Sequence, residues 1–386
     1  MHLIKRSCEI FGLMLLLQAC SSPVPVPDRL LTERPGQSVK NIILMIGDGM
    51  GPEHRRLAQL IENEPLAMEQ LPIQGQVHTD SFNGEVTDSA AAATAMATGI
   101  KTRNKYIGLD ADKNTVSNIT EAAKAAARAS GLITTTQITH ATPAAFVAHI
   151  DSRKKMCDIA LQMATANIDV LMGGGEACFL PENLPGCHGA SGKRNDGINL
   201  IEMMQSDGMY YICTREELLQ LNTSSEGRLL GLFAAEDMPR PFSPTLAEMT
   251  STALNILSRQ PRGFFLMVEG GQIDWGSHKN NALEVMQSLR GFDQAVRVAS
   301  RFAAEHGDTL LIVTADHETG GLEISWQQGD EGPFTAADGR SFYINWATEQ
   351  HTAVDVPLTA TGPMADLLQG EIDNTRIYYV ISRALH

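Results

Sequence analysis

Short, unbroken apolar runs separated by helical segments restrict this chain to a small set of folds. Residues 41–46, NIILMI, end at Gly47, and residues 132–139 form a β-branched run that ends before His140. Apolar runs of this length are typical of strands buried on both faces. Further strands are predicted over residues 169–172, 263–268 and 309–314. Strands that alternate with helices predict an α/β fold, a three-layer sandwich in which helices flank a central, mostly parallel sheet.

Helical signals lie between these runs. Capping boxes at 214–217 and 245–248 open two helices. Gly131 stands where a helix over residues 118–130 would close. Other helices are predicted over residues 53–61, 156–167, 282–306 and 374–385. The glycines at 173–175 lack the spacing of a phosphate loop, so we interpret them as a turn.

The charge balance excludes one class of partner. The chain has 386 residues, 43% of them hydrophobic, which is enough for one large domain or two modest ones. Acidic residues outnumber basic ones by 45 to 30, the formal charge is -15, and no run of basic residues is present. This balance argues against a nucleic-acid-binding surface. An acidic protein that handles an anionic substrate needs local positive charge, which metal ions supply.

The N-terminus has the features of a secretory signal. Two basic residues precede an apolar run over residues 10–17, which is too short to span a membrane. The following LQAC, which ends at Cys20, resembles the lipobox of bacterial lipoproteins. We therefore expect residues 1–19 to be a signal peptide and residues 20–38 a Pro-rich tether. Residues 39–386 then form the folded domain.

Lipidation of Cys20 would be the only link to a membrane. Because Ser21 and not an aspartate follows Cys20, the pattern resembles that of outer-membrane lipoproteins of the bacterial cell envelope. A plain cleaved signal would instead release a soluble protein into the periplasm or outside the cell.

Four cysteines remain after the signal. In an oxidising compartment they predict disulfides. Cys178 and Cys187 flank a loop rich in proline and glycine, which favours their pairing. Cys157 with Cys213 would follow by elimination. No CxxC spacing is present, so we do not expect a cysteine-rich metal site.

The segment TDSAAAATAMATG at residues 87–99 places a serine at the start of a helix. Asp88 and Ser89 precede a run of alanines, the residue with the highest helix propensity. Ser89 is therefore expected in the first turn, where free N–H groups and the helix dipole favour an anion. Its hydroxyl either caps the helix or acts as a nucleophile against a phosphate.

Carboxylate and imidazole side chains follow four predicted strands. They are Asp48, His140, Glu269, and Asp316 with His317. Ligands bind beyond the carboxyl ends of strands in open parallel sheets, so we expect these side chains to meet there as metal ligands. Asp274 and His278 have i, i+4 spacing, which places both on one helical face. A carboxylate with an imidazole is a common part of a zinc site.

Six segments together resemble the alkaline phosphatase family, in the family's order. They are IGDGM around Asp48, TDSAAAATAMATG around Ser89, THATPAAFVAH at 139–149, MVEGGQIDWGSH at 267–278, TADHETGG at 314–321 and EQHTAVDVP around His351. The resemblance covers nearly the whole chain after the signal. It implies that family's fold, a phosphomonoesterase activity on small-molecule phosphate monoesters, and a homodimer.

The resemblance also implies a role for each matching residue. Ser89 is the nucleophile that becomes a phosphoserine, and Arg153 holds the phosphate oxygens. Two zinc ions are implied, one held by Asp274, His278 and His351, the other by Asp48, Asp316 and His317. A magnesium ion is implied next to Asp48, held also by Thr142 and Glu269. Two zinc ions about 4 Å apart stabilise the attacking and leaving oxygens of an in-line displacement.

Two active-site positions take less usual values for the family. His140 stands where some members have aspartate, which alters the third metal site, and Trp275 where some have lysine or histidine. Loss of a cation near the phosphate should weaken product binding, although Trp275 could simply pack at the rim of the cleft. Small peripheral insertions are expected at about 177–197 and 322–348, the second in place of a larger family insertion.

Two other functions remain open at this point. A phosphodiesterase or sulfatase on the same scaffold usually has threonine or a modified cysteine as nucleophile and lacks the third metal set, so Ser89, Thr142 and Glu269 favour the monoesterase. The other is a catalytically silent lipoprotein that binds metal or phosphate; the complete ligand set argues against it.

Overall fold

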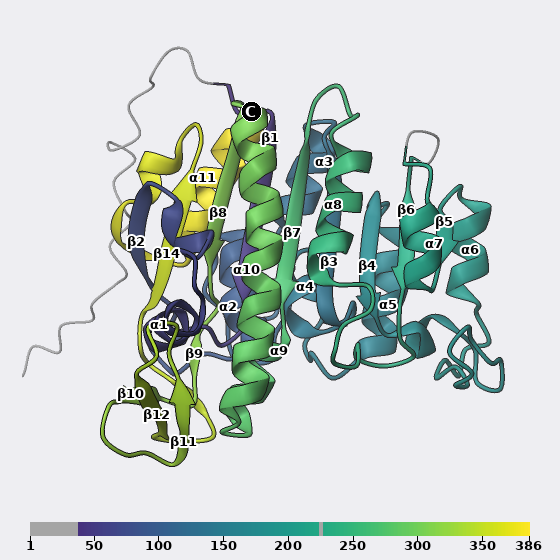
Figure 1. Ribbon diagram of the computed structural model, residues 1–386. Helices are drawn as coiled ribbons and strands as arrows, with labels where there is room; N and C mark the ends of the chain where they lie inside the picture. Colours follow the sequence, from purple (N-terminus) through teal and green to yellow (C-terminus); the bar gives the residue numbers. More distant parts are fainter. Residues whose placement is uncertain (1–37, 224–226) are drawn as a thin grey trace, which may run out of the picture. The chain divides into compact units, whose positions relative to one another are not determined.

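The chain folds around a ten-stranded sheet that is parallel except at one strand. The computed structural model describes residues 38–223 and 227–386. In spatial order the strands are β15 (Gly370–Asp373), β2 (Ile73–His78), β14 (Val356–Thr361), β8 (Thr309–Thr314), β1 (Asn41–Gly47), β7 (Phe264–Gly270), β3 (Ala129–Gln137), β4 (Val170–Gly174), β6 (Leu229–Leu232) and β5 (Tyr210–Ile212). Among the described strands of this sheet, only β14 pairs antiparallel, with β2 and with β8 (Figure 1). The predicted mostly parallel sheet is confirmed.

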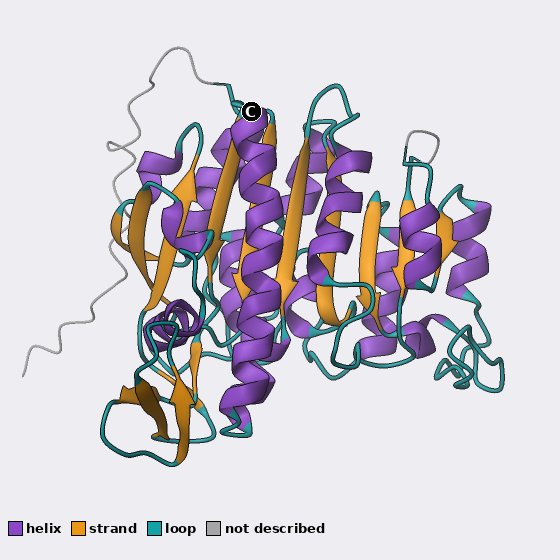
Figure 2. Cartoon of the chain, in the orientation of Figure 1, coloured by secondary structure: helices purple, strands orange, loops and turns teal. Residues whose placement is uncertain are grey.

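Helices cover both faces of this sheet (Figure 2). The helices are α1 (Pro52–Ile61), α2 (Ser89–Thr98), α3 (Ile119–Ala125), α4 (Ala141–Ala145), α5 (Met156–Thr165), α6 (Leu200–Ser206), α7 (Arg215–Gln220), α8 (Leu246–Leu257), α9 (Gln272–His278), α10 (Ala282–Glu305) and α11 (Thr375–Leu385). On one face α10 packs against α8 and the central strands, and on the other α2 packs against α4 and α11. This is the predicted three-layer α/β sandwich.

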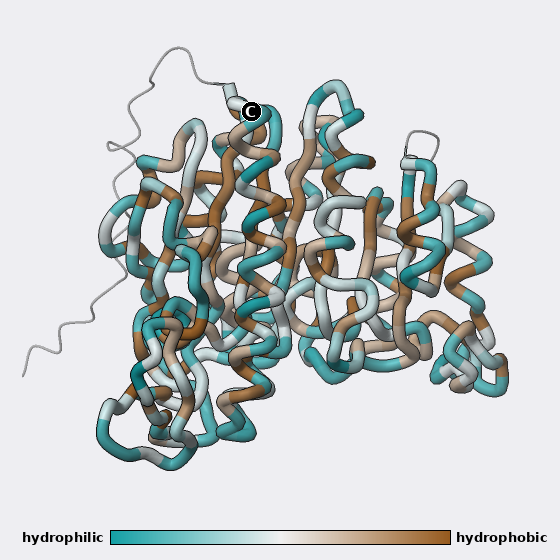
Figure 3. Tube along the Cα trace, in the orientation of Figure 1, coloured by the Kyte–Doolittle hydropathy of each residue, from teal (hydrophilic) through white to brown (hydrophobic). Residues whose placement is uncertain are grey.

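The central strands form the core because both of their faces are buried. Every residue of β1, β7 and β8 is buried, as continuous apolar runs require. The long helix α10 buries Val285, Leu289, Phe292 and Val296, which recur every three or four residues along one face. Figure 3 shows the result, with apolar residues concentrated along the strands and polar residues on the outer sides of the helices.

Two further small sheets lie outside the central one. β10 (Leu322–Ser325), β12 (Ser341–Trp346) and β11 (Glu331–Thr335) form an antiparallel sheet within the insertion expected at 322–348. β9 (Glu318–Thr319) pairs with β13 (His351–Thr352). The second pairing brings His351 next to the residues that follow β8.

One predicted helix end was wrong. The helix expected over residues 118–130 ends at Ala125, and Ala127 takes a left-handed conformation with φ 56°. Gly131 lies inside β3 instead of capping the helix, where a Cβ would lie 2.9 Å from the Leu257 side chain. The turn expected at 173–175 was also misplaced, since its first two glycines end β4. The capping boxes of α7 and α8 are both present as predicted.

The predicted disulfide pairing was wrong as well. The bonds join Cys157 to Cys178 and Cys187 to Cys213, not Cys178 to Cys187. The first turn of α5 packs against the short helix η3 (Glu176–Phe179), which brings Cys157 and Cys178 together. Arg194 holds this contact by donating hydrogen bonds to the carbonyl oxygens of both cysteines. Loop composition alone could not reveal a helix-to-helix contact.

The predicted signal peptide, the predicted lipidation site Cys20 and the predicted tether up to residue 37 lie outside the described residues. Within residues 38–223 and 227–386, no helix combines the length and the apolar character needed to cross a bilayer.

Candidate active site

The four adjacent strands β8, β1, β7 and β3 deliver the predicted residues to one edge of the sheet. Asp48 follows β1, and Glu269 is the next-to-last residue of β7. Asp316 follows β8 by two residues, and His140 follows β3 by three. Because these strands are parallel, their carboxyl ends meet, and the four side chains fall into two groups of possible metal ligands that share Asp48.

Ser89 is the first residue of α2, as predicted. Asp88 is the N-cap, and its carboxylate accepts a hydrogen bond from the Ala91 N–H. This leaves the Ser89 hydroxyl free of the capping role. Ser89 is buried, and its Oγ lies 3.2 Å from Nε2 of His317. The structure therefore separates the cap from the residue predicted to be the nucleophile.

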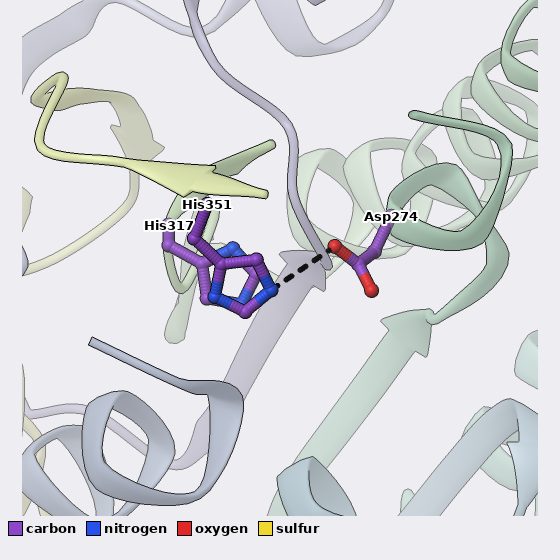
Figure 4. Close-up of side chains that lie close together, drawn as sticks. All are labelled: Asp274, His317 and His351. Atoms are coloured by element: carbon purple, nitrogen blue, oxygen red, sulfur yellow. Dashed lines mark ion pairs between the residues drawn. The ribbon is translucent and has the colours of Figure 1, made fainter. Parts of the chain in front are cut away.

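Asp274, His278 and His351 come together as predicted. Asp274 Oδ1 lies 3.3 Å from Nε2 of His278 and 3.5 Å from Nε2 of His351. The two histidine nitrogens lie 3.2 Å apart. Figure 4 shows His351 directed at Asp274, with the His317 ring stacked on His351 at 3.6 Å between centroids.

A backbone carbonyl orients the ring of His278 and that of His351. Nδ1 of His278 donates to the carbonyl oxygen of Glu349, and Nδ1 of His351 to that of Thr87. The Nε2 atoms are then the ones that face Asp274. This is the arrangement usual for histidines that bind metals, whose second nitrogen is held by a carbonyl or carboxylate.

A second group of ligands surrounds Nε2 of His317. This nitrogen lies 3.4 Å from Oδ1 of Asp48 and 3.3 Å from Oδ2 of Asp316. All three side chains are fully buried. Asp316 Oδ1 accepts a hydrogen bond from the Gly49 N–H, which fixes its position beside Asp48.

A third group shares Asp48. It brings Asp48, His140 and Glu269 close enough to hold one ion. Thr142, on α4, lies two residues after His140 and is fully buried. Its hydroxyl has no hydrogen-bond partner among the described residues. One carboxylate oxygen of Glu269 accepts a hydrogen bond from Thr134, and the other has no partner within the described residues.

Arg153 and Trp275 lie at the edge of this centre. One guanidinium nitrogen of Arg153 is 3.1 Å from Asp88 and the other 3.3 Å from Nε2 of His140. The half-buried Trp275 meets the ring of His140 edge to face, at 5.9 Å between centroids. Both residues predicted for the phosphate region are therefore adjacent to the ligands.

The buried polar atoms here lack partners, which tests whether metal ions fit. Among the described residues, both carboxylate oxygens of Asp48, one each of Asp316 and Glu269, and Nδ1 of His140 accept or donate no hydrogen bond. Such atoms are costly to bury unless something binds them. The donor set is oxygen and imidazole nitrogen, which suits zinc and magnesium. The residues therefore fit divalent cations.

Electrostatics support the same conclusion. Burial, and then the neighbouring Asp316, raises the pKa of Asp48 well above its usual value. Burial also raises the pKa of Glu269 to about 7 and, together with the Asp274 carboxylate, that of Asp316 to about 6. Carboxylates held this close repel one another when ionised, and cations between them remove that cost.

Four other histidines have hydrogen-bond partners outside the three groups of possible ligands. His54 bonds Ser277, His78 bonds Asp355, His149 bonds the Gly108 carbonyl, and His188 bonds that of Leu232.

Two threonines that contact the ligands were missed from sequence. Thr134 pairs in register with Glu269 across β3 and β7, and Thr319 contacts both Asp274 and His317. Strand register could have indicated the first, but nothing local indicated the second.

Comparisons with known proteins identify the family of this chain. The family model described as alkaline phosphatase matches residues 39–339. Alkaline phosphatase 3 of Bacillus subtilis is 33% identical, over 90% of this chain and 89% of its own length. The solved alkaline phosphatase of the Antarctic bacterium TAB5 superposes with a TM-score of 0.81 at 32% identity, covering 90% of this chain and 99% of that one. A histidine-to-aspartate mutant of the TAB5 enzyme, described with magnesium bound in its M3 site, gives a TM-score of 0.79 at 31% identity, covering 90% and 98%.

Proposed function

Because this chain belongs to the alkaline phosphatase family, hydrolases that act on phosphate monoesters, we propose that it hydrolyses such esters through a phosphoserine at Ser89. The observation that carries this proposal is the position of the Ser89 hydroxyl. It lies 3.2 Å from His317, inside a buried cluster whose carboxylates lack partners among the described residues.

Three groups of residues are available to hold the metals. Asp274, His278 and His351 would hold one zinc ion, and Asp48, Asp316 and His317 a second. Asp48 with Thr142 and Glu269 would hold magnesium, and His140 lies at the same place. When bound, such ions act as Lewis acids that make a hydroxyl more acidic and neutralise charge that develops on phosphoryl oxygens.

The chain itself positions the reacting serine. Asp88 accepts the N–H bond at the start of α2 and so leaves the Ser89 hydroxyl available. The Ser89 hydroxyl gives up its proton as Oγ attacks phosphorus; one P–O bond forms as the bond to the ester oxygen breaks, and the alcohol leaves after taking a proton from water. Water then attacks the phosphoserine from the opposite side and breaks the bond to Ser89 Oγ, which releases phosphate, returns a proton to the serine and restores the configuration at phosphorus.

Arg153 is the residue proposed to orient the phosphoryl group. Its guanidinium is held by Asp88 and His140 next to Ser89, and a guanidinium fork can contact two phosphate oxygens at once. None of the roles proposed here involves the alcohol part of the ester, so we expect broad specificity.

The His140 position bears on the third metal. The TAB5 mutant described with magnesium has aspartate in place of a histidine. Oxygen donors suit magnesium better than imidazole does. We therefore propose that His140 weakens magnesium binding in this chain, and that zinc competes for the third site.

The experiment that tests this function compares a monoester and a diester of the same phenol. The proposal expects the monoester to have the higher kcat/KM by at least about a hundredfold, and Ser89→Ala to abolish turnover while metal content is kept. Acid quenching during turnover should trap a phosphate on the peptide that contains Ser89. A diester preference would favour the phosphodiesterase. Metal binding without turnover would favour a silent binding protein.

We propose that the protein works outside the cytoplasm as a homodimer. The basic and apolar residues before Cys20 and the two disulfides are features of secreted proteins. Residues 20–38 would then tether the domain of residues 39–386 to a lipid at Cys20.

The proposed dimer follows from family resemblance alone. Mass analysis of the mature N-terminus and light scattering test these two points.

A further inference from the structure

The hydroxyl of Thr319 stands between two of the proposed metal sites. Thr319 Oγ1 lies 2.5 Å from Oδ1 of Asp274 and 3.2 Å from Nδ1 of His317. Asp274 belongs to the group with His278 and His351, whereas His317 belongs to the group with Asp48 and Asp316. Thr319 is fully buried, so water cannot replace either contact.

Counting protons fixes the direction of both hydrogen bonds. A threonine hydroxyl has one proton to donate, and an ionised carboxylate can only accept. Thr319 therefore donates to Asp274. The second contact then requires the Nδ1–H of His317 to donate to Thr319 Oγ1. This selects the tautomer of His317 whose Nε2 carries a lone pair.

The selected nitrogen is the one that faces the reacting groups. Nε2 of His317 lies 3.2 Å from Ser89 Oγ and within 3.4 Å of a carboxylate oxygen of Asp48. The other tautomer would carry its proton on Nε2, so this nitrogen could not coordinate a metal ion. A metal-binding histidine usually has its second nitrogen held by a carboxylate or carbonyl, and here a hydroxyl takes that place.

Backbone contacts on both sides hold Thr319 in place. Its N–H donates to the carbonyl oxygen of Gly49, and it pairs with His351 across β9 and β13. Gly49 adopts φ 75°, and a Cβ on it would lie 2.9 Å from Thr319 Oγ1 and 2.8 Å from the Asp274 backbone. Glycine thus lets the loop after β1 close over the threonine.

We propose that Thr319 is a positioning residue that links the two metal sites, through Asp274 on one side and the tautomer of His317 on the other. The inference rests on the proposed function, because it takes these residues to be metal ligands. Its consequence is that loss of one hydroxyl weakens metal binding at both sites.

The test titrates the metal-free full chain with zinc against a competing chelator and measures the affinity of each site. Thr319→Val keeps the shape of the side chain and removes the hydroxyl, whereas Thr319→Ser keeps the hydroxyl. We expect Thr319→Val to weaken both sites by about 10- to 100-fold, and Thr319→Ser to remain within about threefold of the original chain.

Thr250→Val is the matched control. Thr250 is also fully buried, and among residues 38–223 and 227–386 its hydroxyl bonds only the Leu246 carbonyl within α8. This variant should bind zinc like the original chain. Unchanged zinc affinity in Thr319→Val overturns the inference, and so does a loss confined to one site. Equal losses in Thr319→Ser and Thr319→Val would mean that packing, not the hydroxyl, is responsible.

Failure of the inference is distinguishable from failure of the proposed function. If the original chain binds no zinc, the proposed function fails before any variant is compared. If it binds zinc and Thr319→Val binds it equally well, only the link through Thr319 fails. Circular dichroism of each metal-free variant establishes folding, and Thr319→Ala replaces Thr319→Val if the valine variant does not fold.

Discussion

Asp48 and Glu176 occupy similar places in the fold but have opposite surroundings. Both are buried carboxylates that follow strands of the parallel sheet, β1 and β4 respectively. Glu176 accepts hydrogen bonds from the Tyr211 hydroxyl at 2.5 Å and from the Cys187 N–H at 2.8 Å. Neither oxygen of Asp48 has a hydrogen-bond partner among the described residues.

This difference separates a structural carboxylate from a ligand. Position at a strand end and burial are common to both residues, so neither property identifies a site. Hydrogen bonding does, because a satisfied buried carboxylate stabilises the loop around it, whereas an unsatisfied one needs a cation. Glu176 therefore anchors the loop of the Cys187–Cys213 disulfide, and Asp48 belongs to the proposed metal centre.

The largest expected effect comes from neutralising each carboxylate in turn. Asp48→Asn should lower kcat/KM by roughly a thousandfold or more, because it removes charge shared by two proposed metal sites. Glu176→Gln should leave kcat/KM within about threefold and lower the free energy of unfolding by about 1–3 kcal/mol. Steady-state kinetics and urea unfolding measure the two quantities. Loss of activity in Glu176→Gln, with activity kept in Asp48→Asn, would contradict the distinction between a structural carboxylate and a ligand.

The pH dependence of stability sharpens the same comparison. In the metal-free protein the pKa of Glu269 is raised to about 7, so the native state holds a proton that the unfolded chain loses near pH 4.5. This carboxyl therefore costs stability as the pH rises from about 4.5 through 7. Relative to the original chain, metal-free Glu269→Gln should gain stability between pH 5 and pH 8.

A difference between two variants is the appropriate measure, because other groups act in the opposite direction. Burial lowers the pKa of His54 to about 4, and the contribution of this group outside the cluster cancels in the comparison. Urea unfolding at both pH values supplies the numbers. A difference that stays constant, or shrinks as the pH rises, contradicts the picture of uncompensated carboxylates.

A smaller effect is expected at the third site. His140→Asp replaces an imidazole by an oxygen donor beside Asp48 and Glu269, and should strengthen magnesium binding by about tenfold. Activation of the dialysed enzyme by added magnesium measures this. His149→Asp is a control on a histidine that bonds the Gly108 carbonyl outside the centre. If His140→Asp binds magnesium with the same affinity as the original chain, His140 is not part of the third site.

The smallest effect concerns Trp275. Trp275→Lys adds a cation close to His140 and should tighten inhibition by inorganic phosphate by a few-fold, since the charge lies in a partly exposed position. Trp275→Leu separates the loss of the indole from the gain of charge. Inhibition constants that are the same for both variants would mean that Trp275 only packs at the rim.

The sequence predicted features that depend on local residues or on strand order. The N-terminal position of Ser89 follows from the alanine run, and the cap of α8 from Thr245 and Glu248. The meeting of Asp48 with Asp316 follows from the rule that parallel strands end at one edge.

Features that depend on packing between distant segments could not be predicted. The Cys157–Cys178 bond depends on how α5 contacts η3, and Gly131 lies in close contact with the Leu257 side chain of α8. Thr319 is the clearest case. Its role depends on the contact between β9 and α9, which brings the Thr319 hydroxyl to Asp274. The spacing of residues in the sequence does not predict this contact.

The central claim is that the unpartnered buried carboxylates are metal ligands that serve Ser89. The most direct measurement is the metal content per chain by mass spectrometry, taken together with the rate on an aryl phosphate before chelation, after chelation and after zinc is restored. Our account predicts about two zinc ions per active chain. Turnover should be lost when chelation removes the zinc ions and regained when zinc is restored. A chain that hydrolyses the ester at an unchanged rate with no divalent metal bound would contradict it.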